Sequence, residues 1–204
     1  PIYFISIQSI MTDIVALAEA NQRKAREVIA KLRVVEAWEA VGAEAHLVGS
    51  LRTGLLMKHR DIDFHIYSSP FRLSDSFAAM AALVADPAVK RFEGANLLHT
   101  PEACVEWHLW YDDGGEEWQV DMIHLVKGSR YDGYFERVAE RIEAVITPRQ
   151  RETVLRLKYE TPDDEKIMGI EYYLAVIRDG IADYPAFVQW RKQQPADRII
   201  EWIP

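Results

Sequence analysis

The chain has 204 residues, of which 49% are hydrophobic and 27% are charged. This is ordinary globular composition, sufficient for one substantial core or for one domain with a small helical addition. The net charge of −8 and the pI of about 5.3 disfavour extended binding to nucleic acid, because an acidic surface repels a phosphate backbone.

Two further features bear on the cellular location of the protein. The single cysteine, Cys104, excludes an internal disulfide and suits a reducing environment, so we expect a cytoplasmic protein. No apolar run reaches the roughly 18–20 residues that cross a bilayer, so no membrane association is expected. Residues 1–10 are apolar without the flanks of a signal peptide, and form either a leading strand or an extension upstream of Met11.

The first part of the chain predicts a mixture of helices and strands. A long helix is expected because apolar residues between Ala25 and Trp38 recur every three or four positions, and Gly42 ends it. Strands follow, most clearly where Ile62, Phe64 and Ile66 alternate with polar residues. The expected elements are helices at 12–41 and 73–85, strands at 44–48 and 61–67, and a hairpin of strands 106–111 and 117–126 around the turn 112–115.

From Tyr131 onward the pattern is helical. Proline and glycine divide it, and Thr161-Pro162-Asp163-Asp164 has the composition of a helix start. The expected helices are 131–146, 148–159, 163–179 and 184–193. The sequence thus predicts an α+β fold: a domain at 1–130 with a small mixed sheet and flanking helices, and a helical region at 131–204.

The chemically informative stretch runs from Val48 to Tyr67. Asp61 and Asp63 are two apart on a predicted strand, so their side chains lie on one face. Ile62 and Phe64 would anchor the opposite face in a core. Paired carboxylates of this kind suit Mg²⁺, which prefers oxygen ligands and keeps positions open for water and phosphate. The alternative is that both acids form the solvent face of an amphipathic strand.

The loop before this strand is basic. Gly49 and Ser50 end the preceding strand, and Arg52, Lys58 and Arg60 follow with no intervening acid. Glycine lets backbone N–H groups approach an anion, and the cations would neutralise a metal-bound triphosphate. We therefore predict that these five residues bind the nucleotide, the alternative being a solvated basic loop.

Asp121 supplies a third acid on the second strand of the predicted hairpin. If that strand lies beside the strand at 61–67, its carboxylate joins Asp61 and Asp63, to bind a metal or to accept the proton of an attacking hydroxyl. Glu116 and Glu117 are nearby competitors for this role. The strand histidines show no metal-ligand spacing, and only His59, in the basic loop, is a candidate for the site.

The run Gly49-Ser50, ten residues, Asp61-Ile62-Asp63 and then Val120-Asp121-Met122 resembles the polymerase β-type nucleotidyltransferase superfamily. The form Lys58-His59-Arg60-Asp61-Ile62-Asp63 is particularly similar to aminoglycoside and lincosamide nucleotidyltransferases. The resemblance implies that Gly49 and Ser50 hold the β- and γ-phosphates, and that Asp61, Asp63 and Asp121 are catalytic and bind two Mg²⁺ ions. The helical part carries no motif for a particular acceptor.

The expected function is therefore a metal-dependent nucleotidyltransferase. It would move AMP from ATP, the favoured NTP, to the hydroxyl of a small molecule and release pyrophosphate, and it could form a homodimer. One alternative is a non-catalytic relative that binds nucleotide or acts as an antitoxin or regulatory partner. Another is a polymerase acting on nucleic acid, which the acidic charge disfavours.

Overall fold

A five-stranded mixed sheet forms the centre of the first part of the protein. The computed structural model describes residues 13–194 and 200–204, so the expectations for residues 1–10 lie outside the described residues. The strand order is β1-β2-β5-β4-β3, with β2 and β5 parallel and the other neighbours antiparallel. The strands are β1 (Ala43–Val48), β2 (Asp61–Ser68), β3 (Val89–Asn96), β4 (Cys104–Asp113) and β5 (Glu116–Val126). The predicted α+β class is confirmed.

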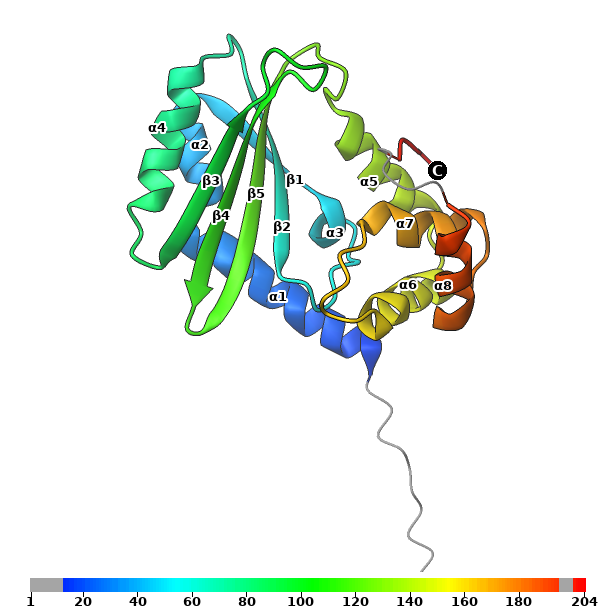
Figure 1. Ribbon diagram of the computed structural model, residues 1–204. Helices are drawn as coiled ribbons and strands as arrows, with labels where there is room; N and C mark the ends of the chain where they lie inside the picture. The colour runs from blue at the N-terminus through cyan, green and yellow to red at the C-terminus, as the bar shows by residue number, and fades with distance from the viewer. Residues whose placement is uncertain (1–12, 195–199) are drawn as a thin grey trace, which may run out of the picture.

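Helices cover one face of this sheet (Figure 1). They are α1 (Ile14–Leu32), α2 (Val34–Glu39) and α4 (Leu73–Val84), and a single-turn helix, α3 (Gly49–Arg52), follows β1. Their apolar stripes pack on the side of β2 that carries Ile62, Phe64 and Ile66, all at most 2% exposed. The opposite face of β2, which carries Asp61 and Asp63, is left free of these helices.

The prediction of a single helix at 12–41 is wrong in one respect, because this segment forms two helices, α1 and α2. Arg33 ends α1 in the left-handed conformation, with a φ of 57°, and its N–H bonds to the carbonyl of Ile29. The chain turns there, so α2 can bury Val34 and Trp38 in the same core. At its other end the helix starts as expected, with the Asp13 carboxylate accepting from the N–H of Ala16.

Strand β3 was not predicted. Its exposed, charged sequence lacks a clear alternation, because it is an edge strand that pairs only with β4. Gly94 lies directly against the ring of Trp107 on β4, where an added Cβ would come within 2.5 Å of a ring carbon. Gly94, a residue type that usually interrupts strands, therefore leaves room for the Trp107 ring to lie against β3.

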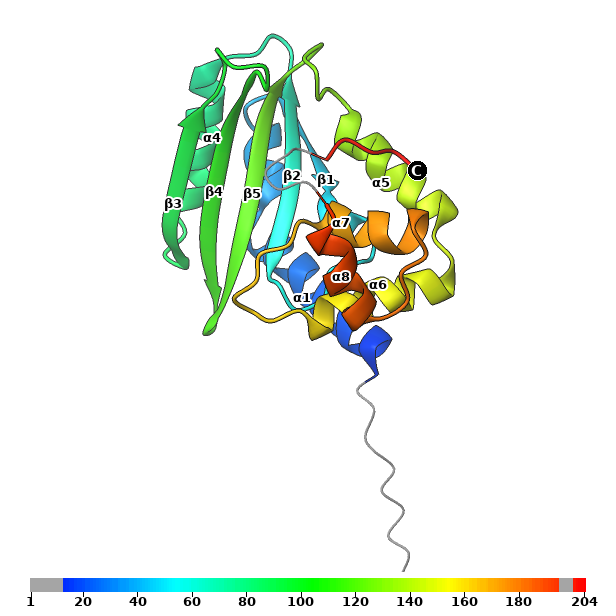
Figure 2. The same cartoon turned by 45° about the vertical axis from the view of Figure 1, so that its right-hand side comes forward.

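The C-terminal helices lie together beside the sheet (Figure 2), and their apolar side chains form a second hydrophobic core. They are α5 (Tyr134–Val145), α6 (Pro148–Glu160), α7 (Gly169–Tyr173), a π-helical turn η1 (Leu174–Arg178) and α8 (Tyr184–Lys192). Ile14 and Ala18 of α1 also enter this core, so α1 spans both parts of the molecule. The division of the chain at residue 130 stays a prediction.

The helix predicted at 163–179 begins six residues later, at Gly169. Thr161 ends α6 instead of starting a new helix: its hydroxyl donates to the carbonyl of Leu157 at 2.8 Å and accepts from Tyr172. Asp163 pairs with the ammonium of Lys58 at 2.7 Å, which holds the segment across the loop before β2. Among the described helices none is long and apolar enough to span a bilayer.

Candidate active site

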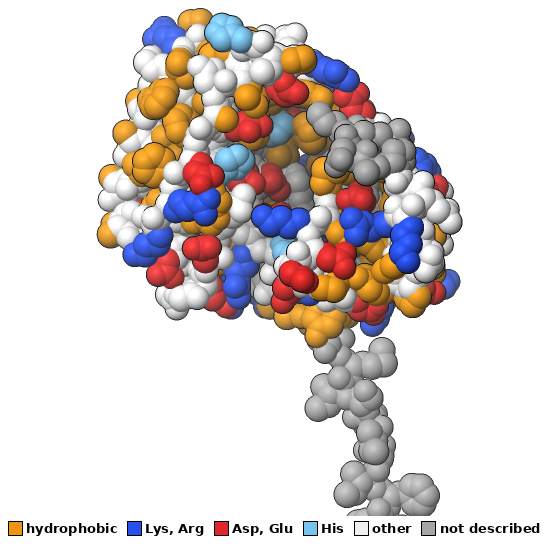
Figure 3. Space-filling model, in the orientation of Figure 1, with side chains coloured by type: hydrophobic (Ala, Val, Ile, Leu, Met, Phe, Trp, Pro, Cys, Tyr) orange, Lys and Arg blue, Asp and Glu red, His pale blue; other side chains and the backbone are white. Residues whose placement is uncertain are grey.

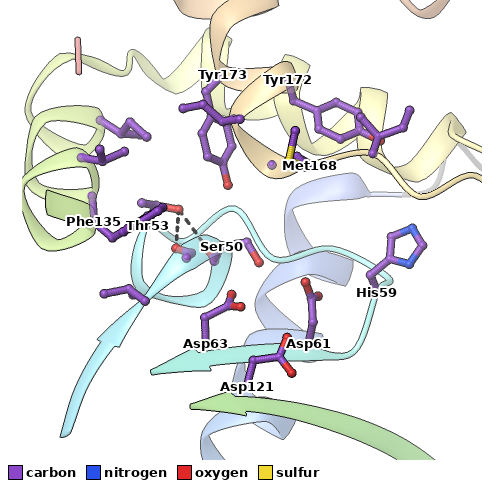
Figure 4. Close-up of a pocket in the computed structure, with 18 of the residues that line it drawn as sticks. Ser50, Thr53, His59, Asp61, Asp63, Asp121, Phe135, Met168, Tyr172 and Tyr173 are labelled. Carbon is purple, nitrogen blue, oxygen red and sulfur yellow. Dashed lines mark hydrogen bonds between the residues drawn. The ribbon is translucent and has the colours of Figure 1, made fainter. Parts of the chain in front are cut away.

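The parallel pairing of β2 with β5 brings the three predicted acids together. Asp63 is the direct register partner of Asp121, and Asp61 lies two residues away on the same face as Asp63. Figure 4 shows the three carboxylates from the two adjacent strands grouped below Ser50. The adjacency on which the role of Asp121 depends is therefore present.

Gly49 allows the loop after β1 to lie against Asp63. Val48 pairs with Asp63 across the β1–β2 ladder, and Gly49 then turns with a φ of 68° into α3. An added Cβ at this position would lie 2.1 Å from a carboxylate oxygen of Asp63. The backbone of Gly49 and the half-turn that carries Ser50 thus come closer to the carboxylate than any other residue type permits.

The three acids repel one another in a buried site. Burial raises the pKa of Asp63 to about 8, and the neighbouring carboxylates of Asp61 and Asp121 add to the rise, while Lys158 opposes it. Burial also raises the pKa of Asp61, against the charges of Lys158 and His59. Like charges held this close in a buried site favour either a proton or a cation between them.

Asp121 is held by two donors that the sequence did not suggest. The amide of Gln119 donates to both of its oxygens, at 2.9 and 3.1 Å, and Nδ1 of His108 lies 2.7 Å from one of them. His108 lies opposite Asp121 in the β4–β5 ladder, so this contact follows from strand register. Glu116 and Glu117, the other candidate acids, lie at the start of β5, and Glu116 pairs with Lys24 and Arg60.

The donor set suits a divalent ion. Oxygen ligands on a rigid strand face are what Mg²⁺ prefers, and their mutual repulsion is relieved by a cation. Within residues 13–194 and 200–204, no three His, Cys, Asp or Glu side chains are already closed together as metal ligands. In the described part of the chain no other side chain donates a hydrogen bond to Asp61 or Asp63, whereas the oxygens of Asp121 accept from Gln119 and His108.

A cavity of about 650 Å³ lies over the carboxylates, between the sheet and the C-terminal helices. Figure 3 shows the corresponding hollow in the surface, with acidic and histidine side chains on its sheet side. Gly49, Ser50 and the three acids all line the cavity. The site therefore belongs to both parts of the chain.

Lys158 of α6 is the cation that sequence reasoning missed. It is 8% exposed and lines the cavity, where its ammonium donates to the carbonyl of Leu55 at 2.9 Å and lies 3.4 Å from the hydroxyl of Tyr173. A signal was available, because Lys158 occupies a position in the apolar stripe formed by Val154 and Leu155. A lysine at a buried helical position indicates a local anionic partner.

Two of the three predicted loop cations line the cavity and the third does not. Lys58 and Arg60 line the cavity, although Lys58 also donates to the carbonyl of Thr161 at 2.5 Å. Arg52 does not line it; its guanidinium pairs with Glu143 of α5. Because α3 is a helix rather than an open loop, Arg52 leaves it on the side that faces α5. His59, the histidine that the sequence offered as a candidate for the site, does line the cavity.

Several solved structures share the fold. They include a cytoplasmic RNA terminal U-transferase (18% identity, TM-score 0.51), the RNA terminal uridylyl transferase Cid1 (20%, 0.53) and the poly(A) polymerase complex GLD-2–GLD-3 (11%, 0.52). The matches cover 80%, 78% and 84% of this chain, and 50%, 47% and 61% of those chains. This chain thus spans about half of the length of the structures it resembles. No curated protein sequence matches it.

The sequence profile of the nucleotidyltransferase domain matches residues 29–178, which include all three acids and most of the C-terminal helices. Solved neighbours hold magnesium-bound GTP or ATP analogues, in agreement with the use of divalent ions by nucleotidyltransferases. The particular closeness to aminoglycoside enzymes that the sequence suggested does not emerge from these matches. Because the profile covers most of the chain, the protein belongs to the nucleotidyltransferase domain family.

Proposed function

We propose that the protein transfers a nucleoside monophosphate, AMP from ATP, to the hydroxyl of a small molecule and releases pyrophosphate. The observation that carries this proposal is the register of β2 and β5, which sets Asp63 beside Asp121 next to Gly49 and Ser50. Carboxylates, a glycine-serine turn and buried cations around one cavity are the parts that nucleotidyl transfer needs.

The residues divide into two groups. Gly49 and Ser50 would hold the β- and γ-phosphates, with the ammonium groups of Lys58 and Lys158 and the guanidinium of Arg60 neutralising their charge. Asp61 and Asp63 would hold magnesium, with Asp121 as the third carboxylate. Bound Mg²⁺ would offset the charge that develops on the phosphate oxygens. Arg52 is left out of this group because it does not line the cavity, whereas Lys58 and Arg60 do.

At the α-phosphorus, the transfer step forms one bond and breaks one. The acceptor oxygen attacks the α-phosphorus, the bond from that phosphorus to the bridging oxygen of pyrophosphate breaks, and Asp121 takes the proton of the hydroxyl. Gln119 and His108 hold the Asp121 carboxylate toward Asp63 during this step.

A small acceptor is favoured over RNA by charge. The net charge of −8 opposes a long phosphate backbone, although the structural neighbours named above act on RNA. Binding to an RNA oligonucleotide that weakens steeply with salt would argue for the polymerase alternative.

Pyrophosphate release from Mg²⁺-ATP tests the proposal. We expect release by the native chain, loss of at least about a hundredfold in Asp63→Asn, and no change in Asp164→Asn, an exposed acid away from the cavity. Tight ATP binding without release for any acceptor, and with no effect of Asp63→Asn, would support the non-catalytic alternative.

A further inference from the structure

The cavity has an aromatic compartment beyond the carboxylates. His65 is the next residue after Asp63 on the same face of β2, and its ring contacts Phe135 of α5 edge-on, with centroids 4.8 Å apart. Tyr131 and Tyr134 continue this contact at 5.9 and 5.1 Å from Phe135. We call these four residues the aromatic compartment; all of them line the cavity. Figure 4 shows Phe135 entering the site from α5 beside Ser50 and Thr53.

The charges in the cavity restrict what this compartment takes. Among the described lining residues the acids are Asp61, Asp63 and Asp121, the carboxylates assigned above to the metal and the transfer step. The cations are Lys58 and Arg60 in the loop before β2, Lys158 on α6, and Lys166 in the segment between α6 and α7. A polycationic acceptor would find no further carboxylate there, and an anionic triphosphate would use the cations. An uncharged acceptor remains.

The compartment offers flat aromatic surface and one imidazole side chain. His65 is 6% exposed, and its Nδ1 has no hydrogen-bond partner in the described part of the chain. Val138 and Trp202 add apolar lining next to the rings. The cavity, at about 650 Å³, falls within the roughly 300–1,000 Å³ range of small-ligand pockets.

We infer that the aromatic compartment binds the acceptor, and that the acceptor is an uncharged, ring-bearing alcohol or phenol. Its ring would pack among Phe135, Tyr134 and Tyr131, and its hydroxyl would point along β2 toward Asp63 and Asp121. The inference rests on the proposed function for the identity of the ligand as an acceptor. The preference for an uncharged ring follows from the lining alone.

Binding of 2-naphthol, an uncharged two-ring phenol, tests the compartment without catalysis. Its fluorescence should report binding to the full chain, weakened at least about tenfold by Phe135→Arg, which places a charge among the rings. Phe77→Ala removes another exposed phenylalanine, on α4 and outside the cavity, and should change the affinity less than twofold. Affinity for Mg²⁺-ATP should stay the same in both variants.

Two results of the binding assay would overturn the inference. One is equal 2-naphthol affinity in Phe135→Arg and the native chain, or no binding at all. The other is a parallel loss of ATP affinity in Phe135→Arg, which would assign the compartment to the nucleobase. The 2-naphthol binding assay contains neither Mg²⁺ nor ATP, so failure of pyrophosphate release alone counts against the proposed function and not against the compartment.

Turnover separates the acceptor classes. With Mg²⁺-ATP we expect faster pyrophosphate release on adding 2-naphthaleneethanol, an uncharged aromatic alcohol, than on adding kanamycin or a 15-nucleotide oligoadenylate. Stimulation by kanamycin or by the RNA in place of the aromatic alcohol would overturn the inference.

Discussion

Replacing Gly49 by alanine tests how closely the loop after β1 must approach Asp63. The new Cβ would start 2.1 Å from Oδ2 of Asp63, whereas an ordinary contact is about 3.4 Å, so the carboxylate or the loop must move by about 1.3 Å. A misplacement of about 1 Å in a reacting site costs roughly a hundredfold in rate. We therefore expect Gly49→Ala to lower kcat for pyrophosphate release about a hundredfold.

The same substitution also strains the backbone, and Gly42→Ala is the matched control. Both glycines have a positive φ, 68° and 78°, but an added Cβ at Gly42 meets nothing within 4 Å. The positive φ alone should cost each variant about 1–2 kcal/mol of unfolding free energy, measured by urea titration, and the overlap with Asp63 adds to the loss in Gly49→Ala. Only Gly49→Ala should lose activity. Full activity in Gly49→Ala, or equal loss of activity in both variants, would refute the reasoning.

Three other changes have defined outcomes. His108→Leu should lower kcat about 10–100-fold and leave KM for ATP unchanged. His108→Asn should recover much of the lost kcat, because its amide can still donate to Asp121. An equal loss of kcat in both variants would contradict a positioning role for His108. Lys158→Met should raise KM for ATP about 10–100-fold, and an unchanged KM would remove Lys158 from the triphosphate site. His124 is buried and its pKa is lowered to about 4, below the roughly 6.5 of an unfolded histidine, so folding stability is full above pH 6.5 and is lost as the pH falls toward 4. Urea titrations should show about 2 kcal/mol lost from this group between pH 7.5 and 5, a loss absent in His124→Asn; the same slope in that variant would contradict it.

The sequence predicted the strands whose side chains alternate and the hairpin whose turn contains two glycines. It did not predict β3, because an edge strand with one partner needs little apolar alternation and because Gly94, a residue type depleted in strands, disfavours the prediction of a strand. The helix expected from Asp163 failed for a different reason. A proline followed by acids favours a helix start only locally, and Lys58, more than a hundred residues earlier, pairs with Asp163 instead.

The site was accessible to sequence reasoning where its residues are close in the chain. Asp61 and Asp63 share a face because a strand has a period of two, and this follows from spacing alone. The approach of Asp121 depends on β5 docking parallel to β2, which is a long-range pairing. His108 and Lys158 reach the site only through strand register and helix packing, so neither could be assigned from spacing, even though Lys158 interrupts an apolar stripe.

The proposed function requires that carboxylates from two strands form one metal centre beside a glycine-serine turn. A crystal structure of the protein with Mg²⁺ and a non-hydrolysable ATP analogue tests it most directly. We expect metal density between Asp61 and Asp63, the Asp121 carboxylate directed toward it, and the triphosphate against Gly49 and Ser50. Nucleotide bound elsewhere, or Asp121 turned away from an empty Asp61–Asp63 pair, would contradict it.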